Sequence, residues 1–198
     1  DGKMLCLEKD LGSVPMTDPN TLSWYIKWCA KHYPASRYEL ILWDHGGGSV
    51  SGYGYDEKFA SSGSMSLAGL DKALTDGGVK FDFIGFDACL MATAETALTM
   101  SQHADYLIAS EETEPGVGWY YTDWLTALGK DPSMPTIQLG QKIVDSFVDT
   151  CAQKCRGQAT TLSVIDLAEL EMTLSDALAD FSKSTAKLIQ GKQYQTVS

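Results

Sequence analysis

A histidine and a cysteine each stand just after an apolar run, and both side chains can take part in acyl transfer. Residues 40–43 lead to His45, and residues 81–86 lead to Cys89. In open α/β sheets, functional side chains gather in the crevice beyond the carboxyl ends of the strands. The pattern therefore predicts a cysteine nucleophile with a histidine as its acid–base partner.

The chain between these two residues predicts that they meet in space. It contains a loop, a helical pattern and a second apolar run, which together form a β-α-β unit whose crossover is right-handed in almost all proteins. Neighbouring strands lie about 4.8 Å apart. The imidazole of His45 and the thiol of Cys89 can then reach the same substrate carbonyl.

Backbone donors are predicted at the same place. We expect a helix to start after Asp87, so that Cys89 falls in its first turn, where the helix dipole favours a thiolate. Gly46 has no side chain to obstruct a substrate and can offer a second N–H group. Gly46 and Cys89 are thus the predicted oxyanion hole, worth about 3 kcal/mol per donor in other enzymes.

Each of these residues also has a structural interpretation. A single cysteine after a strand is more often a buried small residue than a nucleophile. His45 changes this balance because it precedes a glycine run, whereas His32 and His103 lie near predicted helix C-termini, where histidine is favoured for dipole reasons.

The neighbouring acidic and aromatic residues leave alternatives open. Asp44 either orients His45 or ends its strand, and Asp87 caps the next helix, binds substrate, or does both. The aromatic residues at positions 119, 120, 121 and 124 are interpreted as packing rather than as a binding platform.

Two other interpretations of the glycine run at residues 46–48 are excluded by the sequence. A phosphate-binding loop requires a Gly-Lys-Ser/Thr ending that does not follow residues 46–48. An esterase requires a Gly-x-Ser-x-Gly elbow, and residues 48–52 carry Val50 at the position of that serine.

Composition narrows the class of partner. The 198 residues carry a formal net charge of −11, which disfavours nucleic acids and anionic membranes and favours cationic substrates. Five cysteines leave at least one thiol free, and we expect that thiol to be Cys89. Cys151 and Cys155 share a face of a predicted helix, as small buried residues rather than metal ligands.

Apolar periodicity predicts the fold class. Strands are expected at residues 3–7, 38–43, 81–86, 106–109 and 160–165, and helices at residues 19–33, 67–77, 88–103 and 167–189. Residues 45–64 are expected to form an active-site loop, and residues 110–116 an acidic loop. This alternation predicts an α/β fold, with an open, mostly parallel sheet between two layers of helices.

Two segments carry a resemblance to a known family. Residues 41–48 (ILWDHGGG) and 83–92 (FIGFDACLMA) resemble the clostripain-type cysteine peptidases, relatives of caspases, gingipains and legumain. The resemblance covers roughly residues 22–135, including the acidic loop. It implies a caspase-like sheet, a catalytic dyad of His45 and Cys89, and Asp87 on the floor of a pocket that selects arginine or lysine.

The chemistry of Asp87 agrees with such a pocket, because a guanidinium binds a carboxylate through two charge-assisted hydrogen bonds. Glu112 or Glu114 can add a second carboxylate, and the sequence does not decide between them. The expected activity is endopeptidase cleavage after Arg or Lys through a thioester acyl-enzyme. The alternative is a catalytically silent module that binds basic peptides, and a thiol-redox domain is disfavoured because no second cysteine lies near Cys89.

Further expectations come from the same resemblance. Family members are often activated by cleavage between histidine and cysteine, and Lys58 is the candidate site. No cofactor is required by the sequence; some relatives need calcium, which the acidic composition permits although no Asp-x-Asp-x-Asp-Gly loop is present. We expect an exported bacterial protein, and residues 1–198 as one peptidase domain that lacks an upstream strand and continues beyond its C-terminus.

Overall fold

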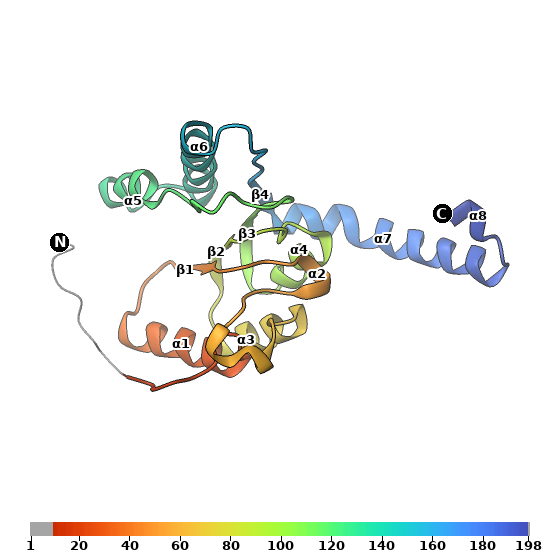
Figure 1. Cartoon of the computed structure of the whole chain (residues 1–198), viewed down its shortest axis with the longest axis horizontal. Helices are drawn as coiled ribbons and strands as arrows, with labels where there is room; N and C mark the ends of the chain where they lie inside the picture. Colours follow the sequence, from red (N-terminus) through yellow and green to blue (C-terminus); the bar gives the residue numbers. More distant parts are fainter. Residues whose placement is uncertain (1–9, 198) are drawn as a thin grey trace.

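A four-stranded sheet forms the centre of the protein. The computed structural model describes residues 10–197. The strands lie in the order β1-β2-β3-β4, where β1 to β3 are parallel and β4 is antiparallel to β3 (Figure 1). Their bounds are β1 (Glu39–Trp43), β2 (Phe81–Asp87), β3 (Ala104–Ala109) and β4 (Ser163–Asp166).

Helices cover both faces of this sheet and complete three layers (Figure 1). One face carries α1 (Pro19–His32), α3 (Leu67–Gly77) and α4 (Ala94–Met100), and the other carries α5 (Tyr121–Lys130) and α6 (Thr136–Lys154). The long helix α7 (Leu167–Gln190) packs its first turns beside β3 and then extends away from the sheet, followed by α8 (Tyr194–Val197). The predicted α/β class with a mostly parallel sheet is confirmed.

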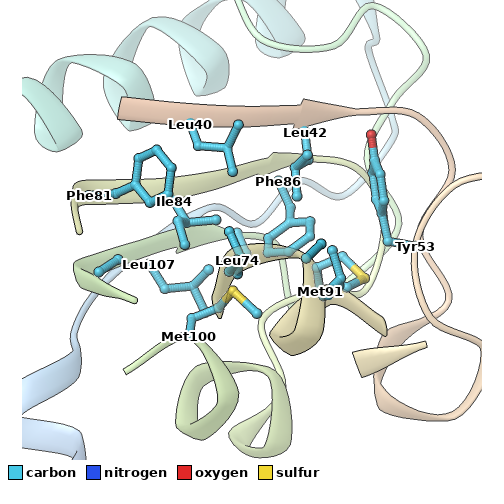
Figure 2. Packing of buried hydrophobic residues seen from close by; sticks show 14 of the residues in the cluster. Leu40, Leu42, Tyr53, Leu74, Phe81, Ile84, Phe86, Met91, Met100 and Leu107 are labelled. Atoms are coloured by element: carbon cyan, nitrogen blue, oxygen red, sulfur yellow. The ribbon is translucent and has the colours of Figure 1, made fainter. Parts of the chain in front are cut away.

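Alternating side chains of β2 build the two cores. Ile84 and Phe86 point to the α1/α3 face and are fully buried there, whereas Phe83 points to the α5/α6 face. Figure 2 shows the core on the α1/α3 face of the sheet. There, side chains of β1, β2 and β3 pack near Met91 and Met100, which follow β2 in the chain. Because side chains alternate between the two faces from Phe83 onwards, Asp87 at the end of β2 faces the α5/α6 side, where it contacts Trp119 and Tyr121.

Local signals in the sequence explain the helix ends on the first face. The side chain of Asp18 accepts a hydrogen bond from the backbone N–H of Asn20 and so caps α1, and Pro19 stands at the first helical position. The hydroxyl of Ser66 caps α3, which ends at Gly78 in the left-handed conformation, with φ 70°. These caps fix where the loops that lead to the sheet begin and end.

Most predicted strands and helices are present with shifts of a few residues at their ends. The predicted strand at residues 3–7 lies outside the described residues. Residues 45–64, expected to be an irregular loop, contain the short helix α2 (Gly48–Ser51) and the 3-10 helix η1 (Glu57–Ser62). Bridges from Tyr53 to Gly46 and to Met65 hold the segment against the core.

The predicted helix at residues 88–103 is wrong in its first part. Helix α4 begins only at Ala94, capped by the hydroxyl of Thr93, and Leu90 has a positive φ of 62°. The N–H groups of Leu90 and Ala92 donate to the carbonyls of Glu112 and Ser110, respectively, and not to carbonyls within a helix. Pairing with the acidic loop therefore replaces the first helical turns after Asp87.

Strand β1 lies at one edge of the sheet, and among residues 10–197 no strand pairs with its outer side. The expectation of a single peptidase domain that lacks an upstream strand and continues beyond its C-terminus remains a prediction. Within the described part of the chain, no helix is both long enough and apolar enough to cross a membrane.

Candidate active site

A cavity of about 550 Å³ opens beyond the carboxyl ends of β1 and β2. Both His45 and Cys89 line it, as the sequence predicted for neighbouring strand ends. Carboxyl groups, glycines and one aromatic ring make up most of the remaining wall. The lining residues are Trp43, Asp44, His45, Asp87, Ala88, Cys89, Glu114, Pro115, Gly116 and Gly118.

The register of the two strands explains why the histidine and the cysteine share this cavity. Trp43 of β1 pairs with Asp87 of β2, and His45 and Cys89 each lie two residues further along their chain segments. The His45 side chain is exposed, and Cys89 is half-buried with a free thiol. A substrate carbonyl entering from solvent can therefore meet both groups.

The acidic loop holds the thiol of Cys89. The backbone N–H of Glu114 donates to Sγ over 3.3 Å, and Sγ lies 3.9 Å from the carbonyl oxygen of the same residue. The sulfur thus has a backbone donor and a backbone acceptor, both from Glu114 of the acidic loop. The expectation that Cys89 lies in the first turn of a helix is wrong, because Cys89 lies in a turn ahead of α4 and is therefore not placed at the helix N-terminus.

The backbones at Gly46 and Cys89 lie against each other. A Cβ added at Gly46 would stand 2.0 Å from the carbonyl oxygen of Cys89, so any side chain there would displace one of the two strand ends. Within residues 10–197, no acceptor is recorded for the N–H of Gly46 or of Cys89. Cys89 lines the cavity and Gly46 directly follows the lining residue His45; the oxyanion hole formed by these two residues stays a prediction.

Asp87 forms a buried, hydrogen-bonded floor in this cavity. Its side chain accepts the backbone N–H of Trp119 at 3.1 Å and the hydroxyl of Tyr121 at 2.9 Å, and the residue is only 4% exposed. Gly118, with φ +62°, lets the chain pass close to the carboxylate, since a Cβ there would lie 3.0 Å from Asp87 Oδ1. These donors orient Asp87 and offset part of the cost of burying it.

A second carboxyl group, that of Glu114, stands beside Asp87. Burial and the negative charge of Asp87 raise the pKa of Glu114 to about 9. Burial also raises the pKa of Asp87, while the hydrogen bonds from Trp119, Tyr121 and Glu114 oppose that rise. Glu114 therefore retains its proton at neutral pH, and the indole N–H of Trp119 donates to its Oε1 at 3.4 Å.

The remaining predicted residues lie at or away from this cavity. Asp44 lines it and accepts the backbone N–H of His45 at 2.5 Å. The Glu112 side chain is exposed and does not line the cavity, although its carbonyl holds Leu90. Lys58 is exposed on η1, where its N–H donates to Asp56. No group of three potential metal ligands occurs among residues 10–197.

The sequence did not predict the roles of Trp119, Tyr121 and Trp43 at this site. Trp124 is buried packing, as predicted, but Trp119 and Tyr121 also donate hydrogen bonds to Asp87. Nothing in their spacing reveals this contact, because it joins residues more than thirty positions apart. Trp43 lines the cavity and is 75% exposed; strand alternation from the buried Leu42 was the signal that could have found it.

Comparisons with known proteins all lead to one peptidase family. The sequence profile of the clostripain family of C11 peptidases matches residues 8–196. Clostripain of Hathewaya histolytica is 30% identical over 147 residues, which cover 64% of this chain and 28% of clostripain.

Two solved structures show the same fold. A secreted C11 cysteine protease from Bacteroides thetaiotaomicron, bound to an irreversible peptide inhibitor, has a TM-score of 0.66 and 27% identity over 79% of this chain and 47% of its own. An inactive zymogen C11 protease from Parabacteroides distasonis has a TM-score of 0.64 and 30% identity over 84% of this chain and 44% of its own. The chain thus spans less than half the length of these relatives.

Proposed function

Because the chain belongs to the clostripain family of cysteine peptidases, we propose that it is an endopeptidase that cleaves peptide bonds after arginine or lysine. The observation that carries this proposal is the shared cavity of His45 and Cys89, whose floor is an acidic pair. An imidazole and a thiol serve acyl transfer, and the carboxyl groups select a cationic side chain next to the reacting carbonyl.

The first half of the reaction transfers the acyl group to sulfur. His45 takes the thiol proton of Cys89, and the thiolate attacks the carbonyl carbon of the scissile bond. The N–H groups of Gly46 and Cys89 donate to the resulting oxyanion. His45 then gives its proton to the leaving amine, the C–N bond breaks, and a thioester remains on Cys89.

The second half returns the enzyme to its starting state. Water attacks the thioester carbonyl while His45 accepts one of its protons, and a second oxyanion forms against the same two N–H groups. The C–S bond breaks, the thiolate takes the proton back from His45, and the acid product leaves. The N–H of Glu114 lies 3.3 Å from this sulfur and so holds the acidic loop beside the reacting atom.

The acidic pair gives the pocket its preference for cations. Asp87 supplies the negative charge, and Glu114 is the carboxyl group that stands beside it in the cavity, whereas Glu112 faces solvent. A guanidinium or ammonium group would lie against these oxygens and would favour ionisation of Glu114. Peptides with arginine or lysine before the scissile bond are the proposed substrates.

Activation and export are further parts of the proposal. The relative from Parabacteroides distasonis is an inactive zymogen, and Lys58 of this chain is exposed on η1, between His45 and Cys89 in sequence. We propose self-cleavage after Lys58. A relative is described as secreted, and we propose that this protein is likewise exported.

A panel of fluorogenic peptides tests the proposal. The peptides differ only in the residue before the scissile bond: Arg, Lys, citrulline, Leu or Asp. We expect cleavage only after Arg and Lys, loss of cleavage in Cys89→Ala and in His45→Ala, and covalent labelling of Cys89 by an arginyl acyloxymethyl ketone. A protein that binds basic peptides without cleaving them, even after limited proteolysis at Lys58, would instead be the silent binding module.

A further inference from the structure

Trp43 presents a large aromatic surface to solvent at the mouth of the cavity. The residue is 75% exposed, although tryptophan is highly buried on average in folded proteins. It ends β1 on the face opposite to Leu40 and Leu42, whose side chains enter the core in Figure 2. Packing within the described fold therefore does not account for an indole at this position.

The register of the sheet places this indole beside the acidic floor. Trp43 pairs with Asp87 across two parallel strands, and paired residues of neighbouring strands project to the same face. Both residues line the same cavity. Because the strands are about 4.8 Å apart, one bound side chain can contact the ring and the carboxylate at once.

We propose that Trp43 forms a side wall of the cation pocket and stacks on the guanidinium of arginine, so that the pocket prefers arginine to lysine. This inference rests on the proposed function, because it assigns the preference between two cations to a pocket that the function requires. Trp43 is then a specificity-determining residue that neither strand pattern nor acidic charge identifies by itself.

The chemistry of the two cations explains the expected preference. A guanidinium is planar and weakly hydrated, so it can stack on an indole while its edge donates two parallel hydrogen bonds to a carboxylate. A lysine ammonium is a compact, strongly hydrated charge with no plane to stack. Because both side chains carry one positive charge, attraction to the acidic residues alone discriminates weakly between them.

Trp43 also borders a second cavity of about 590 Å³ along the outer edge of β1. Apolar side chains such as Val14, Met16 and Leu22 line much of that cavity. The competing role of Trp43 is thus structural: its ring would pack against another segment placed beside β1. The two roles differ in whether replacing the ring changes selectivity or only stability.

Binding to the Cys89→Ala protein tests the inference without turnover. Calorimetry measures the dissociation constants of Nα-acetyl-arginine methylamide, its lysine counterpart and its neutral citrulline counterpart. We expect the arginine ligand to bind about tenfold more tightly than the lysine ligand, a ratio typical of cation–π contacts at partly desolvated sites. Trp43→Leu should reduce the ratio to about twofold or less, and Trp43→Phe should leave an intermediate ratio.

Phe181→Leu is the matched control, because Phe181 is 68% exposed on α7, away from the cavity. The ratio of arginine to lysine affinity in this control should equal the ratio measured for the Cys89→Ala protein. If Trp43→Leu does not fold, NMR of the Cys89→Ala protein tests the contact instead. The indole N–H resonance of Trp43 should shift when the arginine ligand is added and should stay unchanged with the citrulline ligand.

The outcomes separate this inference from the proposed function. If both cationic ligands bind more tightly than citrulline but the ratio is the same in Trp43→Leu and Trp43→Phe, Trp43 has only a structural role. If neither cationic ligand binds more tightly than the citrulline ligand, the cavity is not a cation pocket. The proposed substrate preference and the role of Trp43 are then both refuted.

Discussion

Replacing Glu114 by glutamine should stabilise the protein at neutral pH. The pKa of this carboxyl rises from about 4.3 in an unfolded chain to about 9 in the folded protein, because burial and the charge of Asp87 disfavour its ionised form. At pH 7 the folded state therefore holds a proton that the unfolded state has released. Stability that is fully present below pH 4 is lost progressively as the pH rises towards 9.

The magnitude follows from the shift. For a fully buried carboxyl, the loss of stability at pH 7 would be about 4 kcal/mol. Glu114 is partly exposed to the cavity, and solvent screening reduces the loss to about 2 kcal/mol. Glutamine keeps the shape, has no charge to bury, and can donate its amide N–H to Asp87. We therefore expect Glu114→Gln to gain about 2 kcal/mol at pH 7, or roughly 4 to 8 °C in Tm.

Urea unfolding of wild type and variant at several pH values between 4.5 and 8.5 is the assay. The difference in free energy of unfolding should be near zero at pH 4.5 and should grow with pH. Glu112→Gln is the matched control, because the exposed Glu112 side chain lies outside the cavity, and it should change stability by no more than about 0.5 kcal/mol at any pH. A Glu114→Gln variant that is less stable at pH 8, or whose difference does not change with pH, would refute the reasoning.

Three further changes test the site. Asp87→Asn should lower kcat/KM for arginine and lysine substrates by at least about 30-fold, since removing one partner of a buried charge pair costs roughly 2 to 5 kcal/mol. Gly46→Ala should destabilise the fold by about 1 to 3 kcal/mol and lower kcat about 100-fold, because its Cβ would meet the Cys89 carbonyl at 2.0 Å. Lys58→Gln should keep the chain intact in mass spectra under conditions where active wild type is cut there.

Each of these changes has a control within the chain. Gly129→Ala places a methyl group where no atom lies within 4 Å, so it should leave both stability and kcat close to wild type or slightly raise stability. Lys142→Gln removes an exposed lysine on α6 and should not alter the pattern of cleavage. Equal loss of activity in Gly46→Ala and Gly129→Ala would contradict the close approach at Cys89. A wild-type enzyme that is fully active while intact at Lys58 would exclude the proposed activation.

Apolar runs were enough to place the catalytic candidates. Residues 40–43 and 81–86 are short, almost wholly apolar and separated by a helical pattern, and such runs become adjacent parallel strands because the crossover rule leaves few other arrangements. Once those strands are parallel, the residues after them must meet at one edge of the sheet. For this reason His45 and Cys89 could be brought to a common cavity without coordinates.

The turn after Asp87 shows where local rules failed. Residues 88–93 have a sequence that a helix would accept, but the chain there pairs with the acidic loop through the N–H groups of Leu90 and Ala92. The competition between a helical turn and a loop partner twenty residues away depends on tertiary contacts. The donor to the Cys89 sulfur is therefore the Glu114 N–H, which no local pattern marks.

The sequence by itself determined the order of the four strands and of most helices along the chain, the edge of the sheet at which His45 and Cys89 lie, and the residue types available there, because periodicity and chain connectivity act locally. The tertiary structure alone decided that Glu114 rather than Glu112 stands beside Asp87, and that Trp43 flanks the same carboxylate. It also raised the pKa of Glu114, through burial and the charge of Asp87. Those features depend on distances between residues far apart in sequence and on the exclusion of water, which only the packed chain establishes.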